Sequence, residues 1–137
     1  MGQNAVLSKE LLIVIKNEIG GLAKIASLVA GKGINIEAIA GYKKDNTSDA
    51  EVIIVTDNND AASETLKAAG YDAISEKEVV IVDLENKTGI LQEFCETLAQ
   101  NGIDLQHVSG TTAGSASSSR LVLSTNDNAK ALNVLQG

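Results

Sequence analysis

Two kinds of hydrophobic pattern follow each other along the chain, and the same succession occurs twice. Residues 11–15 and 79–84 are short, continuous apolar runs, which are typical of central strands in a sheet. Each run leads into a turn rich in Asn and Gly, after which apolar residues recur every three or four positions. This spacing predicts an amphipathic helix with one buried face. The apolar positions of the two helices are Leu22, Ile25, Ala26 and Val29 in the first, and Leu91, Phe94, Cys95 and Leu98 in the second.

The remaining elements follow in the same order in both halves. Gly33 and Gly102 are predicted to end the helices as left-handed caps, since glycine adopts a positive φ without steric cost. Two strands joined by a polar hairpin are expected next, and then a short helix with an Asn or Asp N-cap. The ranges are 34–42, 43–49, 52–56 and near 60–69 in the first half, and 103–111, 112–118, 121–125 and 129–136 in the second.

An internal repeat accounts for this agreement. A shift of 69 residues aligns residues 11–68 with residues 80–137 without a gap. The identical pairs include Asn17 with Asn86, Gly20 with Gly89, Leu22 with Leu91, Gly33 with Gly102 and Gly41 with Gly110. We therefore predict an α+β fold of two ferredoxin-like βαββαβ units in tandem, residues 1–76 and 77–137. Each unit is expected to be an antiparallel sheet with its helices packed on one face.

The source of the last strand of the second unit stays open at this point. Residues 73–75 can supply the last strand of the first unit, but no matching segment follows residue 136. Residues 5–7 are a candidate replacement. Either each unit opens with its own edge strand as a hairpin, which is the cheaper local closure, or the N-terminal segment crosses over and completes the second unit.

Charge and composition narrow the classes of function. The chain has 11 Lys and Arg against 18 Asp and Glu, which argues against nucleic acid, because phosphate binding needs clustered basic residues. The longest apolar runs are far shorter than the ~20 residues that a membrane span needs. No secretory signal pattern is present, and the single Cys95 cannot form an internal disulfide, so a cytoplasmic location is expected.

The turns and the strands after the helices carry a repeated motif. It reads Asn17-Glu18-Ile19-Gly20-Gly21-Leu22 and Gly33-Ile34-Asn35-Ile36 in the first half, and Asn86-Lys87-Thr88-Gly89-Ile90-Leu91 and Gly102-Ile103-Asp104-Leu105 in the second. This pattern resembles the ACT domain. The resemblance covers nearly the whole chain, as two ACT units with no catalytic domain attached. In this respect the chain is similar to the small tandem ACT proteins that bind amino acids as regulators.

The resemblance implies regulation by a small ligand, commonly a free amino acid. ACT units typically pair side by side, and the ligand lies between the first strand–helix loop of one unit and the second strand of the other. Either the chain builds such a junction internally, or two chains build it as a homodimer. The ligand-binding residues that the resemblance implies are Asn17, Ile19, Gly20, Gly21, Leu22, Asn35, Ile36, Asn86, Gly89, Ile90, Leu91, Asp104 and Leu105.

The chemistry of the first loop supports a binding site there. A helix N-terminus exposes unpaired N–H groups, and Gly20 and Gly21 let a carboxylate approach that backbone closely. Asn17 offers an amide donor and acceptor, and Asn35 offers an oxygen to an ammonium group. The structural alternative is that the glycines only permit a tight turn and that the Asn residues only cap the helix. The Gly-Gly pair and Asn35 favour the first loop as the binder.

Two other classes of function are weighed against the amino-acid sensor. A ligand-free interaction or structural module would use the same fold without a site. An enzyme of the acylphosphatase type would need an anion-binding Arg in the first loop, and neither loop contains one. His107 has no second ligand at metal-binding spacing. We therefore expect no enzymatic activity, no metal and no cofactor.

Overall fold

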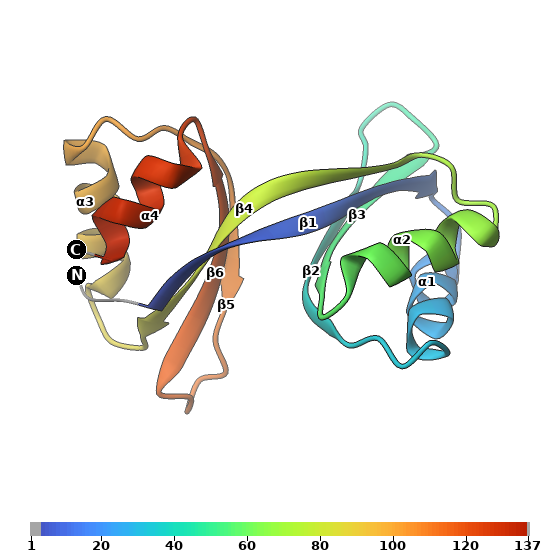
Figure 1. Cartoon of the computed structure of the whole chain (residues 1–137), viewed down its shortest axis with the longest axis horizontal. Helices are drawn as coiled ribbons and strands as arrows, with labels where there is room; N and C mark the ends of the chain where they lie inside the picture. Colours follow the sequence, from blue (N-terminus) through green and yellow to red (C-terminus); the bar gives the residue numbers. More distant parts are fainter. Residues whose placement is uncertain (1–3, 137) are drawn as a thin grey trace. The chain divides into compact units, whose positions relative to one another are not determined.

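The computed structural model describes residues 4–136 as an alternation of strands and helices (Figure 1). The elements are β1 (Asn4–Lys16), α1 (Gly21–Ala30), β2 (Ile36–Lys43), β3 (Asp49–Thr56), α2 (Asn59–Ala68), β4 (Ile74–Glu85), α3 (Ile90–Gln100), β5 (Leu105–Thr111), β6 (Ser118–Thr125) and α4 (Asn128–Gln136). No helix in this range is long and apolar enough to cross a membrane.

The chain forms two compact units, each with the βαββαβ order. The first unit is Lys9–Lys77, and the second comprises residues 78–136 together with residues 4–8. The strand order is β2-β3-β1-β4 in the first unit and β1-β4-β6-β5 in the second. β1 and β4 are thus each divided between the two units, with one segment in each. The predicted fold class, two ferredoxin-like α+β units, is confirmed.

Residues 4–8, the first part of β1, belong to the second unit, whereas the predicted boundary at residue 76 places them in the first. Ala5 is 4% exposed within the core of the second unit, and the Gln136 side chain donates a hydrogen bond to its carbonyl oxygen at 3.0 Å. The start of β4 packs on the first unit in the same way, since Ile74 contacts its core. Neither strand contains a Gly, Pro or Asn that would break it into a hairpin at its midpoint. The arrangement corresponds to the crossover alternative.

The two helices of each unit lie on one face of its sheet (Figure 1). The buried residues of α1 are Ile25 and Val29, and those of α3 are Ile90, Phe94 and Leu98.

Some residues of the predicted apolar helix faces are exposed instead of buried. Leu22 and Leu91 are 48% and 55% exposed, because the first turn of each helix lies beside a surface pocket instead of the sheet. Ala26 and Cys95 are also exposed, so Cys95 is not part of the core. The positive φ predicted for Gly33 and Gly102 is confirmed at 71° in both.

Asn59 joins the start of α2 to β1 in the first unit. Its side-chain oxygen accepts hydrogen bonds from the N–H and the hydroxyl of Thr56 at 3.0 and 2.7 Å, and its nitrogen donates to the Lys9 carbonyl oxygen at 2.8 Å. Asn128 makes the corresponding bonds in the second unit. Asn59→Asp keeps the acceptor but removes the donor, so we expect the free energy of unfolding to fall by about 1–2 kcal/mol in urea denaturation. An equal loss in Asn133→Asp, on the exposed face of α4, would contradict this explanation.

Candidate functional site

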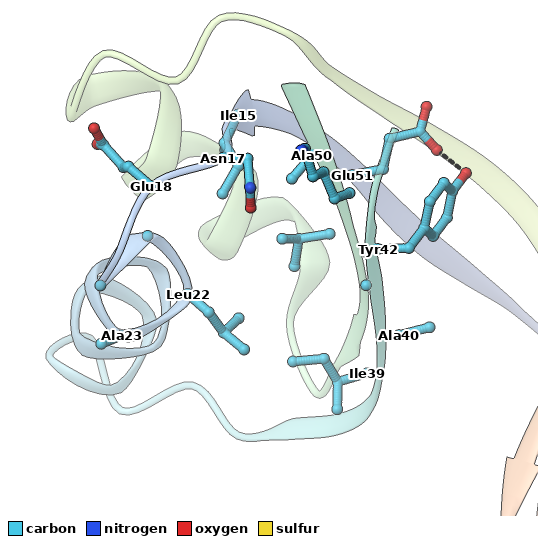
Figure 2. A pocket seen from close by; sticks show the side chains of 15 residues that line it. Ile15, Asn17, Glu18, Leu22, Ala23, Ile39, Ala40, Tyr42, Ala50 and Glu51 are labelled. Atoms are coloured by element: carbon cyan, nitrogen blue, oxygen red, sulfur yellow. Dashed lines mark hydrogen bonds between the residues drawn. The ribbon is translucent and has the colours of Figure 1, made fainter. Parts of the chain in front are cut away.

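A cavity of ≈ 650 Å³ lies in the first unit, between the N-terminus of α1 and the sheet (Figure 2). It opens where β1 and β2 end and β3 begins. Its lining residues are Ile15, Asn17, Glu18, Gly20, Gly21, Leu22, Ala23, Ile39, Ala40, Gly41, Tyr42, Lys43, Ala50, Glu51 and Val52.

The strand directions explain why these segments meet. β1 and β2 are both antiparallel to β3, so they run parallel to each other and end at the same edge of the sheet. Ile15 near the end of β1 and Lys43 at the end of β2 both pair with Ala50. The loop after β1 therefore faces the last residues of β2 and not its first ones.

The loop leaves two backbone donors free at the start of α1. Gly20 is the N-cap, with φ of 85°, and no side chain caps the helix. The Gly21 N–H donates to the Glu18 carbonyl oxygen at 3.2 Å, and the Lys24 N–H donates to the Gly20 carbonyl oxygen at 3.0 Å. The N–H groups between them, those of Leu22 and Ala23, have no acceptor within residues 4–136. Free N–H groups of this kind, together with the positive end of the helix dipole, are suited to an anionic group.

Asn17 places a neutral amide beside these donors. Its backbone N–H donates to the Ser48 carbonyl oxygen at 2.7 Å, which fixes the loop against the β2–β3 hairpin. Figure 2 shows its side chain directed into the cavity, where the amide has no hydrogen-bond partner in the described chain. The equivalent Asn86 instead donates to the Ala116 carbonyl oxygen at 2.9 Å. The two loops therefore differ in whether the amide is available to a ligand.

The walls of the cavity are apolar. Ile39 and Val52 lie on the helix-covered face of the sheet, because they pair in register with the core residues Ile54 and Ile13. Leu22 approaches from α1, opposite Ile39 in Figure 2. These two side chains are 48% and 53% exposed, so the cavity presents apolar surface to solvent.

The acidic residues at the rim are directed away from the cavity. Glu51 lies on the other face of the sheet, where it accepts a hydrogen bond from the Tyr42 hydroxyl and pairs with Lys44 Nζ at 3.4 Å. The Tyr42 hydroxyl holds the pKa of the Glu51 carboxyl below its ordinary value, and the same bond raises the pKa of Tyr42. Figure 2 shows Glu18 pointing outward as well.

This pair predicts a particular pH dependence for Tyr42→Phe. The lowered pKa of Glu51 contributes stability above its unfolded value, which is lost as the pH falls through the folded pKa. The raised pKa of Tyr42 contributes stability that is present below its ordinary value of 10.0 and is lost as the pH rises through the folded pKa. We expect the difference in Tm between native chain and variant to be largest at neutral pH and to shrink toward both extremes. A difference in Tm that does not change with pH would contradict this expectation.

The second unit has an equivalent but smaller pocket of ≈ 280 Å³. The repeat puts Ile90 where the first unit has Gly21, and Leu121 where it has Val52. Both larger side chains line the pocket, and Ile90 is 8% exposed. The second unit thus has larger side chains at these two positions and a pocket of smaller volume.

The open sheet face of the second unit also carries a different charge pair. Arg120, in the place of Glu51, donates from Nε to Asp83 Oδ1 at 2.8 Å and from Nη2 to Oδ2 at 3.2 Å. This guanidinium lowers the pKa of the Asp83 carboxyl.

The structure brings together part of the set of residues proposed from the sequence. Those that line the larger cavity are Asn17, Gly20, Gly21 and Leu22, and those that line the smaller one are Asn86, Gly89, Ile90 and Leu91. Ile19 lies on the other side of its loop, fully exposed, in a neighbouring pocket that it shares with Lys24 and Tyr71.

The remaining proposed residues lie at the opposite end of the strands from the pockets. Asn35 and Ile36 stand at the start of β2, and neither lines the cavity. The Asn35 N–H donates to Asp57 Oδ1 at 3.0 Å. Asp104 and Leu105 have the same place in the second unit, where the Asp104 N–H donates to Asn126 Oδ1 at 2.9 Å.

Sequence reasoning missed the contribution from the end of β2 and the start of β3. Ile39, Gly41 and Val52 were interpreted only as strand residues. The signal that would have found them is the parallel strand–helix–strand connection, since successive parallel strands end at the same edge of the sheet.

Comparisons with known proteins agree on the fold. The ACT domain family matches residues 79–137. Protein BT0572 from Bacteroides thetaiotaomicron is similar in structure with a TM-score of 0.86 and 20% identity, over 96% of this chain and 88% of that one. The ligand-free regulatory subunit of aspartate kinase from Thermus thermophilus is similar with a TM-score of 0.69 and 13% identity, over 98% and 97%. A search of curated proteins gave no significant match.

Proposed function

Because the ACT domain family matches residues 79–137, we propose that the chain is a non-enzymatic regulatory protein that binds a free amino acid. The binding site is the larger cavity, in the first unit. The observation that carries the proposal is the set of unsatisfied polar groups at one end of this cavity: the N–H groups of Leu22 and Ala23 and the amide of Asn17.

These groups match the polar end of an amino acid. The two N–H groups and the helix dipole favour an α-carboxylate, and the oxygen of the Asn17 amide accepts from the α-ammonium. The similarity to the ligand-free regulatory subunit of aspartate kinase supports a regulatory role. No group of His, Cys, Asp or Glu side chains within residues 4–136 is arranged to hold a metal ion.

The cavity is open enough for a second chain to complete it. β2 is an edge strand of the first unit and β5 of the second, so each offers unpaired backbone to another copy. A homodimer that pairs these edges brings the start of one β2 close to the end of another. Asn35 and Ile36, or Asp104 and Leu105, then contact the ligand from the opposite chain. We place this dimer in the cytoplasm, in agreement with the single Cys95.

Regulation requires that the ligand bind two states of the protein with different affinity. A ligand held between two copies binds only the closed dimer, and it therefore shifts the population toward that dimer.

The proposal is tested by the Tm of the protein with each amino acid added in turn. A specific ligand at 100 times its Kd stabilises the protein by about 2.7 kcal/mol. We expect Asn17→Ala to remove the Tm increase and the matched Asn86→Ala, in the second unit, to leave it. No increase with any amino acid would refute the proposal.

A second candidate, a ligand-free interaction module, is favoured by one observation. Leu22 and Ile39 of the first unit are exposed, and so are their equivalents Leu91 and Val108. Apolar residues exposed at equivalent positions in both units are suited to protein contacts. If Ile39→Ser abolishes self-association while no amino acid changes Tm, this candidate holds.

A further inference from the structure

We propose, resting on the proposed function, that the cavity of the first unit selects an amino acid with an uncharged aliphatic side chain, and that each chain binds one such ligand. This selectivity depends on the walls of the cavity, whereas the proposed function depends on its polar end.

The walls offer little to a polar or charged side chain. Beyond the Leu22 and Ala23 N–H groups and the Asn17 amide, a ligand meets Ile15, Ile39 and Val52. A hydroxyl or amide placed against these side chains loses its hydrogen bonds to water without replacement. A methyl group in the same position gains from burial.

A cationic side chain finds no counter-ion in the cavity. The acidic residues of the lining are Glu18 and Glu51, and Figure 2 shows both directed away from it. Glu51 is also engaged by Tyr42 and Lys44 on the other face of the sheet. An acidic side chain has one cation available, Lys43, which shares the helix-covered face with Ala50. Lys43 is exposed, so solvent screens its attraction for an acidic side chain.

The second unit shows the equivalent site with larger side chains and a smaller volume. Ile90 and Leu121 are themselves aliphatic side chains set against this wall, where the first unit has Gly21 and Val52. The fold therefore accommodates aliphatic groups at this place, and in the first unit a ligand provides them. The volumes of ≈ 650 and ≈ 280 Å³ favour one bound ligand per chain.

Isothermal titration of the full chain with isosteric pairs tests the inference. Valine and threonine have the same shape and differ by a methyl for a hydroxyl, and leucine and asparagine are similar in size. We expect the aliphatic member of each pair to bind at least about tenfold more tightly, which equals about 1.4 kcal/mol. Equal or tighter binding of threonine, asparagine, aspartate or lysine would overturn the inference and leave the proposed function standing. Binding of no amino acid would refute both.

Two variants assign the selectivity to this cavity. Val52→Leu copies the second unit and should weaken valine binding at least about tenfold, whereas the matched Leu121→Val should leave it unchanged. Ile39 is 53% exposed, so Ile39→Thr is expected to fold normally and to reduce the preference for valine over threonine. An unchanged preference in Ile39→Thr, or two ligands per chain, would overturn the inference.

Discussion

Ala5→Glu is expected to destabilise the second unit by more than about 3 kcal/mol, although residue 5 lies 73 positions before that unit continues at Glu78. Ala5 is 4% exposed in a core that also contains Phe94 and Leu135. A carboxylate cannot be solvated there, and the longer side chain has no room. The strand would leave the sheet, and β4 of the second unit would lose its neighbour at that edge.

Amide hydrogen exchange measured by NMR distinguishes the two units. We expect exchange in α3 and α4 to accelerate strongly in Ala5→Glu, while α1 and α2 change much less. Val6→Glu is the matched control, because Val6 is 56% exposed in the same strand. Tyrosine fluorescence reports on the unfolding of the first unit alone, since Tyr42 and Tyr71 are the only tyrosines and both belong to that unit. Equal protection of α3 in the two variants would show that the strand does not support the second unit.

The elements of the fold could be predicted because each leaves a local signal. Apolar runs, helical spacing, and the glycines at 33 and 102 all act within a few residues, and the repeat shows each of them twice. The path of β1 and β4 has no such signal. Residues 8–10 and 76–78 are polar, which suits a turn as well as an exposed stretch of strand. Only the burial of Ala5 in a distant core decides between the hairpin and the crossover.

The candidate site was predictable where its chemistry is local and not where it depends on topology. Gly20 and Gly21 mark the loop in the sequence, because a positive φ and a missing side chain are properties of single residues. The difference between the two loops was also visible, as Gly21 against Ile90. The contribution of Ile39 and Val52 follows from strand direction and register, which no short segment encodes.

Phe94→Ala should lower the free energy of unfolding of the second unit by about 3–5 kcal/mol. Phe94 is the only phenylalanine, is 0% exposed and is among the largest fully buried side chains of the described chain. Its loss removes apolar burial and leaves a cavity between α3 and the sheet, which the rigid backbone can close only in part. Urea denaturation followed by circular dichroism, with hydrogen exchange in α3, measures the loss.

The neighbouring Leu91 and the equivalent Ile25 are the controls for this result. Leu91→Ala changes a residue of the same helix that is 55% exposed, so we expect a change within about 0.5 kcal/mol. Ile25 aligns with Phe94 and is 0% exposed, so Ile25→Ala should cost about 2–5 kcal/mol and accelerate exchange in α1 instead of α3. If Leu91→Ala were as costly as Phe94→Ala, the core of the second unit would extend under the first turn of α3. That turn would then be unavailable to a ligand, and its contrast with the first turn of α1, where Leu22 is 48% exposed, would be larger than the exposure of Leu91 indicates.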